Sequence, residues 1–220
     1  MTGKEFSQRP FTFPRGTKVR IAWTPMGDKE KVVEECFFYG ITPIFGSCSS
    51  DPDDFAPVFR AVAKDGKMSN RRPQLCGGSI IFRMIDEIDF ADTDEKIRVW
   101  TEEWGKDGIL VCANCGSVDI QNKAWVDPNT GESVSDADFD TDDNWCEECS
   151  EHHRFCSISE FEEKMDRWFA NADFRTMEKM FDLRYEDFDE EDGYQEFVDE
   201  CEKRWKELSY ESKRELYNDR

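Results

Sequence analysis

Four cysteines in two closely spaced pairs constrain this chain most. Cys112 and Cys115 form one C-x2-C pair, Cys146 and Cys149 form the other, and Gly116 directly follows the first pair. A C-x2-C turn lets two thiolates reach one metal ion without strain, and structural zinc prefers four such ligands in a tetrahedron. We expect the segment between the pairs to form a β-hairpin that brings the second turn back to the first. The spacing therefore predicts a zinc ribbon with one structural Zn²⁺.

The predicted site is closed, because four thiolates leave no position at which water or a substrate could bind the metal. Two alternatives for one of the ligands remain open. His152 lies three residues after Cys149, and Cys156 follows shortly afterwards, so either could replace a ribbon cysteine. His152 and His153 are the only histidines in the chain.

Charge is distributed very unevenly along the 220 residues, whose net charge is −21. Residues 1–100 carry 15 basic and 15 acidic side chains, whereas residues 101–220 carry 14 basic and 35 acidic ones. The first 27 residues are basic, with Lys4, Arg9, Arg15, Lys18 and Arg20 against Glu5 alone. A net charge of about 2 to 8 suffices to keep a small domain soluble, so this excess predicts a binding role.

Nine cysteines would suit a secreted disulfide scaffold, but the number is odd and four have zinc spacing. The chain shows no apolar leader at its N-terminus, and we expect a reducing cytoplasm. No apolar run approaches the roughly 20 residues that a transmembrane helix needs, so we expect no membrane insertion.

The pattern predicts an α+β protein in three parts: a mixed α/β domain at 1–110, the zinc ribbon at 111–156 and an acidic helical segment at 157–220. In the first part we expect strands at 19–23, 79–85 and 108–111, and helices at 28–39, from 51 onward, and at 92–105. Asp28 would cap the first helix, and Asp51-Pro52 would open the second. The apolar residues Phe55, Val58, Phe59 and Val62 have helical spacing in the second.

In the ribbon, strands are expected at 118–126 and 132–134, joined by a turn at 127–131 that contains Pro, Asn and Gly. After it, Ser157 and Glu160 form a capping box that opens an amphipathic helix. Further helices are expected at 174–183 and 194–208, and Ser209 would cap a closing turn.

Catalytic motifs are missing from the sequence. It contains no phosphate-binding glycine loop, and because both histidines lie beside the zinc turn, no Cys–His pair is expected elsewhere in the chain. We interpret Cys48 and Cys76 as ordinary core or loop residues. An enzyme with carboxylate-bound Mg²⁺ in the N-terminal region is the weakest alternative. The sequence predicts a protein that is not an enzyme.

Two acidic runs are the candidate partner-binding surface. Lysine and arginine are scarce near the ribbon, which disfavours direct contact of the ribbon with nucleic acid. An acidic surface attracts basic proteins instead. The candidate residues are Asp136, Asp138, Asp140, Asp142 and Asp143 in the first run, and Glu186, Asp187, Asp189, Glu190, Glu191 and Asp192 in the second.

The run from Cys112 through Trp125, Asp127 and Gly131, which closes on Trp145-Cys146-Glu-Glu-Cys149, resembles zinc-ribbon segments of uncharacterised phage and mobile-element proteins. The closing run Trp205–Tyr217 is similar to their C-terminal helices. The resemblance implies zinc on the four ribbon cysteines and an accessory protein that acts in the host cytoplasm.

Small acidic phage proteins include inhibitors of host defence nucleases. The leading hypothesis is therefore a zinc-stabilised mimic of nucleic acid that inhibits a basic, nucleic-acid-binding host protein, as anti-CRISPR or anti-restriction proteins do. The alternative is a nucleic-acid-binding zinc-ribbon regulator that uses the basic N-terminal region.

Overall fold

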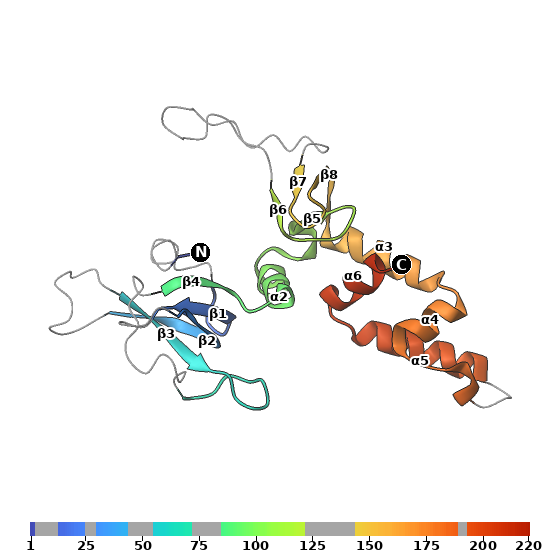
Figure 1. Ribbon diagram of the computed structural model, residues 1–220, viewed down its shortest axis with the longest axis horizontal. Helices are drawn as coiled ribbons and strands as arrows, with labels where there is room; N and C mark the ends of the chain where they lie inside the picture. Colours follow the sequence, from blue (N-terminus) through green and yellow to red (C-terminus); the bar gives the residue numbers. More distant parts are fainter. Residues whose placement is uncertain (3–12, 25–29, 44–54, 72–84, 122–143, 189–192) are drawn as a thin grey trace. The chain divides into compact units, whose positions relative to one another are not determined.

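The computed structural model describes residues 1–2, 13–24, 30–43, 55–71, 85–121, 144–188 and 193–220 (Figure 1). The chain divides into two compact units, Met1–Val99 and Trp100–Arg220, which are described one after the other. Antiparallel sheets and helices occur together, so the predicted α+β class is confirmed.

The first unit is built on a four-stranded antiparallel sheet. In the order β3-β2-β1-β4 across the sheet, the strands are Phe55–Ala61, Val32–Pro43, Lys18–Trp23 and Ile85–Phe90. In β1, Val19 and Ile21 are buried and alternate with the outward-facing Lys18 and Arg20. This period of two confirms the strand predicted at 19–23.

One face of this sheet carries the core of the unit. Helix α2 (Thr93–Trp104) adds Val99 to it, and the helix ends before Gly105, as the prediction for 92–105 required. The buried members of the core are Phe13, Val19, Ile21, Cys36, Phe38, Phe59, Ile85, Ile88, Phe90 and Val99.

The helix predicted at 28–39 is wrong, because residues 32–43 form β2. Cys36 and Phe38 are buried while Val33 is 55% exposed, which is the alternation of a strand with one face in the core. β2 is paired on both sides, to β1 and to β3, and this pairing outweighs the helical spacing of its apolar residues. Asp28, the expected cap, lies outside the described residues.

The helix predicted from Asp51 is also wrong over Phe55–Ala61, which form β3. Pro57 gives the physical reason, since proline inside a helix removes a hydrogen bond and clashes with the preceding turn. In a strand at the sheet edge it is tolerated, and here it pairs with Ile41. Residues 51–54, where this helix is expected to begin, lie outside the described residues. Of the strand predicted at 79–85, residues 79–84 also lie outside them, and Ile85 is the first residue of β4.

The second unit contains two small sheets. β5 (Leu110–Cys112) pairs with β9 (Phe155–Ser157), and β7 (Asn144–Cys146) lies between β6 (Ile120–Gln121) and β8 (Glu151–His153). The 3-10 turn η3 (Lys106–Gly108) precedes β5. The β6–β7 pairing returns the chain to the first cysteine pair, whereas the predicted turn at 127–131 and the strand at 132–134 lie outside the described residues.

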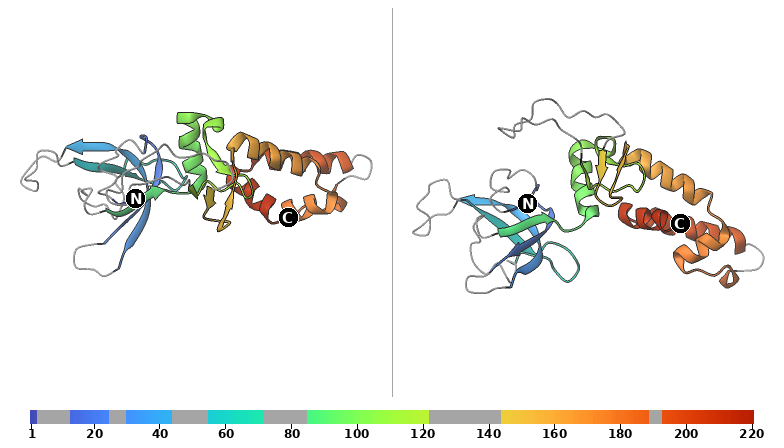
Figure 2. Two further views of the ribbon diagram at one scale, coloured as in Figure 1. Left: turned by 90° about the horizontal axis from the view of Figure 1, so that it is seen from above. Right: turned by 45° about the horizontal axis from the view of Figure 1, so that its top comes forward.

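The helices follow the ribbon strands, and α6 packs alongside α3 (Figures 1 and 2). They are α3 (Ile158–Ala170), α4 (Phe174–Phe181), α5 (Gly193–Glu207) and α6 (Tyr210–Asn218), with the 3-10 turn η4 (Tyr185–Asp187) before α5. The capping box is confirmed: Glu160 N donates to Ser157 Oγ at 3.2 Å and Ser157 N donates to Glu160 Oε2 at 2.9 Å. Ser209 caps α6.

Aromatic side chains fill the space between these helices. Trp205 is 3% exposed, stacks on Phe169 with ring centroids 4.6 Å apart, and donates its indole N–H to Asp166. Trp168 contacts Trp205 edge-on. None of the described helices is both long and apolar enough to cross a membrane.

Candidate metal centre

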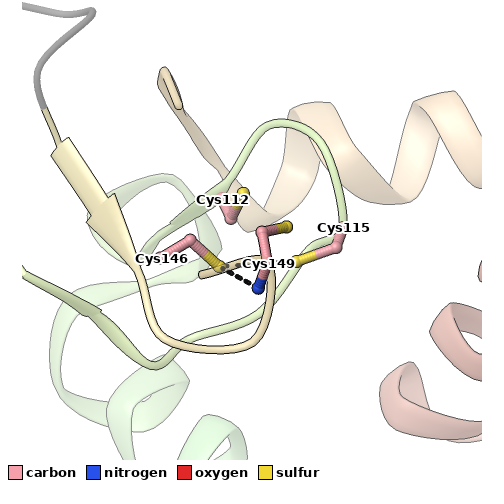
Figure 3. A group of neighbouring side chains, drawn as sticks. All are labelled: Cys112, Cys115, Cys146 and Cys149. Carbon is pink, nitrogen blue, oxygen red and sulfur yellow. Dashed lines mark hydrogen bonds between the residues drawn. The ribbon is translucent and has the colours of Figure 1, made fainter. Parts of the chain in front are cut away.

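The two C-x2-C turns bring four sulfur atoms together (Figure 3). Cys112 ends β5 and Cys146 ends β7, and each leads into the turn that carries its partner, Cys115 or Cys149. All four Sγ atoms lie within 4.8 Å of one another, and those of Cys115 and Cys146 are 3.6 Å apart. A tetrahedral ion with metal–sulfur bonds of about 2.3 Å separates its ligands by about 3.8 Å. The four cysteines therefore lie close enough to hold one metal ion.

The two turns share their backbone geometry. Gly116 N donates to Cys112 O at 2.8 Å, and Ser150 N donates to Cys146 O at 2.9 Å. Each turn then leaves through a left-handed residue, with φ of 73° at Gly116 and 53° at Ser150. This shared geometry directs both members of each pair toward the same point.

Besides its left-handed backbone, a second feature requires glycine at position 116. A Cβ atom at this position would lie 2.3 Å from the ring of Phe161, which is fully buried in α3. The first metal turn therefore packs directly on the helical part of the unit, and only glycine allows that approach.

Hydrogen bonds to sulfur complete the immediate surroundings of the site. Cys149 N donates to Cys146 Sγ at 3.5 Å (Figure 3), and Asn114 Nδ2 donates to Cys149 Sγ at 3.6 Å. Four thiolates around a divalent ion carry a net charge of −2, which such donors stabilise.

The thiol pKa values reflect burial and these contacts. Burial raises the pKa of Cys112 and of Cys115. Burial also acts to raise the pKa of Cys146, but hydrogen bonds from the Cys149 backbone and from neighbouring cysteines bring it below its ordinary value. Metal binding would therefore have to displace protons from buried thiols.

Helix α6 holds the first turn from outside. Cys115 O accepts hydrogen bonds from Arg214 Nη1 at 3.2 Å and from Asn218 Nδ2 at 3.0 Å. Gly116 O accepts one from the Tyr210 hydroxyl at 2.8 Å. Three side chains of one helix thereby fix the backbone that carries Cys115.

Arg214 also reaches the second turn. Its Nη1 donates to Glu148 Oε2 at 2.7 Å, its guanidinium pairs with Glu211, and the residue is 7% exposed. Burial acts to lower the pKa of Arg214, but its hydrogen bonds to Glu211 and Glu148 outweigh burial and raise it. The cation is therefore fixed between the two metal turns.

The alternative ligands are not members of the sulfur group. His152 packs against Trp145 with ring centroids 5.4 Å apart, and Cys156 lies in β9 opposite Val111. In the described parts of the chain, the four ribbon cysteines are the only cluster of three or more potential ligands close enough to hold an ion.

The predicted partner-binding residues are placed only in part. Glu186 and Asp187 lie in η4 and are exposed. The other predicted residues lie outside the description, namely Asp136, Asp138, Asp140, Asp142, Asp143, Asp189, Glu190, Glu191 and Asp192.

Sequence reasoning missed the residues that support the site. Asn114 stands inside the first pair, where an amide donor is a recognisable signal. Tyr210, Arg214 and Asn218 lie about 100 residues from the turn that they bind, and nothing in the spacing points to them.

Comparison with protein-family models, with curated proteins and with solved structures finds no match for this chain. The resemblance of its ribbon and tail to phage and mobile-element proteins stays a prediction.

Proposed function

We propose that the chain is a zinc-stabilised, non-enzymatic interaction protein whose acidic second unit binds a basic protein. The observation that carries the metal-stabilised part of this proposal is the convergence of four cysteine sulfurs on one point. Tetrahedral sets of four thiolates are typical of zinc or iron–sulfur centres. The 3.6 Å separation of two of the sulfurs suits a single ion.

Zinc in this position would act as a cross-link. Cys112, Cys115, Cys146 and Cys149 would occupy all four positions of the tetrahedron, so the bound ion would have no site for water or substrate. Its contribution would be to the folding free energy of the second unit. This is the ground for proposing a structural rather than a catalytic metal.

Charge supports the choice of partner. Residues 101–220 contain 35 acidic and 14 basic side chains, and repulsion among them opposes folding. Such a field accelerates encounter with a basic surface and disfavours acidic partners. Exposed carboxylates on the described part of α5 include Glu196, Asp199, Glu202 and Glu207.

The sharper form of the proposal is mimicry of nucleic acid. Grooves that bind DNA or RNA are basic, because phosphate contacts dominate their affinity. A folded surface rich in carboxylates competes for such a groove. Together with the resemblance to phage proteins, this suggests an accessory protein that inhibits a nucleic-acid-binding host protein.

Affinity capture from a bacterial lysate tests the proposal. The zinc-loaded chain is immobilised, and bound protein and nucleic acid are identified after elution with increasing salt. We expect a basic nucleic-acid-binding protein that elutes with salt and that added DNA or RNA displaces. Nucleic acid captured without such a protein would contradict the proposal and favour the regulator.

A matched pair of variants tests the first acidic run. The first variant changes the five aspartates at 136–143 to asparagine, and we expect it to lose at least tenfold in affinity for the captured partner. The control removes five carboxylates from the first unit, at Glu30, Asp51, Asp53, Asp54 and Asp65. Equal losses in both variants would show that net charge alone matters.

A further inference from the structure

The outward face of the first unit's sheet carries a row of basic and aromatic side chains. Lys18, Phe37 and Arg60 are register partners across β1, β2 and β3. Paired residues of antiparallel strands lie on the same face. The neighbouring row contains the fully buried Val19 and Cys36, so the row with Phe37 lies on the opposite face, away from the core.

Tyr39 extends this row through a β-bulge. Phe38 pairs with Phe59 and Gly40 pairs with Val58, so Tyr39 is the extra residue in β2. The guanidinium carbon of Arg15 lies 3.8 Å from the Tyr39 ring centroid, and that of Arg60 lies 4.7 Å from it. Bulges often redirect a side chain at a binding site.

Backbone contacts hold the two arginines beside this ring. Gly16 N, in the turn that contains Arg15, donates to Phe38 O at 2.8 Å. Arg60 Nη1 donates to Asn70 O at 3.0 Å. The three side chains are therefore positioned by three separate segments of the unit rather than by one mobile loop.

The two arginines beside Tyr39 form no ion pair within the described residues, although the carboxylates Glu35 and Asp89, both register partners of Arg20, lie on the same face of the sheet. Glu35 pairs with Lys18. The hairpin that follows β3 closes when Ala61 N donates to Arg71 O at 2.9 Å. Residues 60–71 contain Arg60, Lys64, Lys67 and Arg71 against Asp65 alone.

We propose that this face, defined by Arg15, Phe37, Tyr39 and Arg60, binds single-stranded nucleic acid. Guanidinium groups contact phosphates and stack on bases, and aromatic rings supply further stacking that tolerates any sequence. A duplex keeps its bases stacked and unavailable to a sheet face. The site goes beyond the proposed function, because it lies in the other unit and takes a ligand of the opposite charge.

Fluorescence anisotropy with the full zinc-loaded chain tests this site. The probes are a labelled 20-nucleotide oligothymidylate and a labelled 20-base-pair duplex, both in about 0.1 M salt, where the Debye length is about 10 Å. We expect the single strand to bind at least tenfold more tightly. Each phosphate contact contributes a slope of about −0.7 to log K against log salt, so two arginine contacts predict about −1.4.

Two double variants of equal charge locate the binding. Arg15→Gln/Arg60→Gln should lose at least tenfold in affinity for the single strand. Lys31→Gln/Arg98→Gln removes the same charge elsewhere in the unit and should stay within twofold of the wild type. Lys31 directly precedes β2 and lies eight residues before Tyr39, about 26 Å away at about 3.3 Å per extended residue.

Variants of the ring separate stacking from charge. Tyr39→Phe should retain binding, and Tyr39→Ala should weaken it at least threefold at unchanged net charge. If Tyr39→Ala does not fold, Arg15→Lys/Arg60→Lys replaces it, since it keeps the charge but removes the planar groups. No binding by the wild type, equal binding of the duplex, or equal loss in both charge variants would overturn the proposal.

Discussion

Arg214 donates a 2.7 Å hydrogen bond to the carboxylate of Glu148, and so joins helix α6 to the turn between Cys146 and Cys149. The same Nη1 lies 3.2 Å from Cys115 O in the other metal turn. One buried guanidinium thus holds both turns. The C-terminal helix is therefore part of the structure around the metal centre.

Replacement of Arg214 should destabilise the second unit strongly. Arg214→Met removes one of the two donors to Cys115 O, the other being Asn218, and it removes the cation that pairs with Glu148 and Glu211. We expect a loss of about 3 kcal/mol in unfolding free energy. Glu148→Gln should cost less than about 1 kcal/mol, because the Glu148 side chain is 48% exposed. Urea unfolding of the zinc-loaded proteins measures both values. Equal costs would contradict the role given to Arg214.

Gly116→Ala should be among the most damaging single substitutions in the chain. The added methyl group would lie 2.3 Å from the Phe161 ring, in a backbone with φ of 73°. Overpacking and backbone strain together predict a loss of about 3 kcal/mol or more.

Gly66→Ala is the control for that substitution. Its φ is 78°, close to that of Gly116, yet a Cβ atom there meets nothing within 4 Å, so only the backbone strain of about 1 to 2 kcal/mol remains. Thermal or urea unfolding of both variants gives the comparison. A Gly116→Ala variant that loses no more stability than Gly66→Ala would show that the turn does not pack on α3 as described.

Removal of the metal should unfold the second unit selectively. Without the cross-link, the two turns lose their shared centre and the contacts of Tyr210 and Arg214 lose their support. After the metal is removed with a chelator, the backbone amides of α3 and α6 should exchange their hydrogens faster. The amides of Val19 and Ile21 in β1 should remain protected from exchange. Uniform loss of protection, or no loss, would contradict this expectation.

Single cysteine variants identify the ligands. Cys112→Ser and Cys149→Ser should each abolish stoichiometric metal binding. Cys36→Ala and Cys201→Ala remove buried cysteines that lie outside the sulfur cluster, and should retain one ion per chain. Elemental analysis of the purified proteins measures the difference.

The thiol of Cys156 should react slowly at neutral pH. Burial raises its pKa to about 11, and the Glu160 carboxylate adds to the shift. Because the thiolate is the nucleophile, alkylation should accelerate about tenfold per pH unit toward pH 11 in the folded protein. In the unfolded protein the rate should level off above about pH 8.5. Mass spectrometry after reaction with iodoacetamide measures the alkylation rate of Cys156 in the folded and the unfolded protein. A rate that levels off near about pH 8.5 in the folded protein would contradict the raised pKa of Cys156.

The same shift has a consequence for stability. Between about pH 8.5 and the folded pKa, the folded chain retains a proton that the unfolded chain releases. The stabilisation from the protonated Cys156 is therefore complete below about pH 8.5 and is lost as the pH rises toward about 11.

Local signals in the sequence were sufficient for the helical segment. The Ser157–Glu160 capping box and the Ser209 cap are formed by neighbouring residues, so their identity alone predicts the helix starts. The metal turns were equally predictable, because both ligands of each pair lie within four residues.

The strands β2 and β3 required information that a local window does not contain. Val32, Val33, Cys36 and Phe37 match a helical spacing, but pairing with β1 and β3 decides the outcome. In β3 the proline was the available signal, and Pro57 should have excluded the helix. The contacts of α6 with the metal turns likewise depend on tertiary packing, which spacing alone does not reveal.

X-ray absorption at the metal edge tests the central claim most directly, because it counts the atoms bound to the ion in the intact protein. One zinc per chain with four sulfur neighbours at about 2.3 Å is the predicted result. A nitrogen or oxygen atom in the first shell, or a metal–metal distance from a cluster, would contradict a closed four-thiolate zinc site.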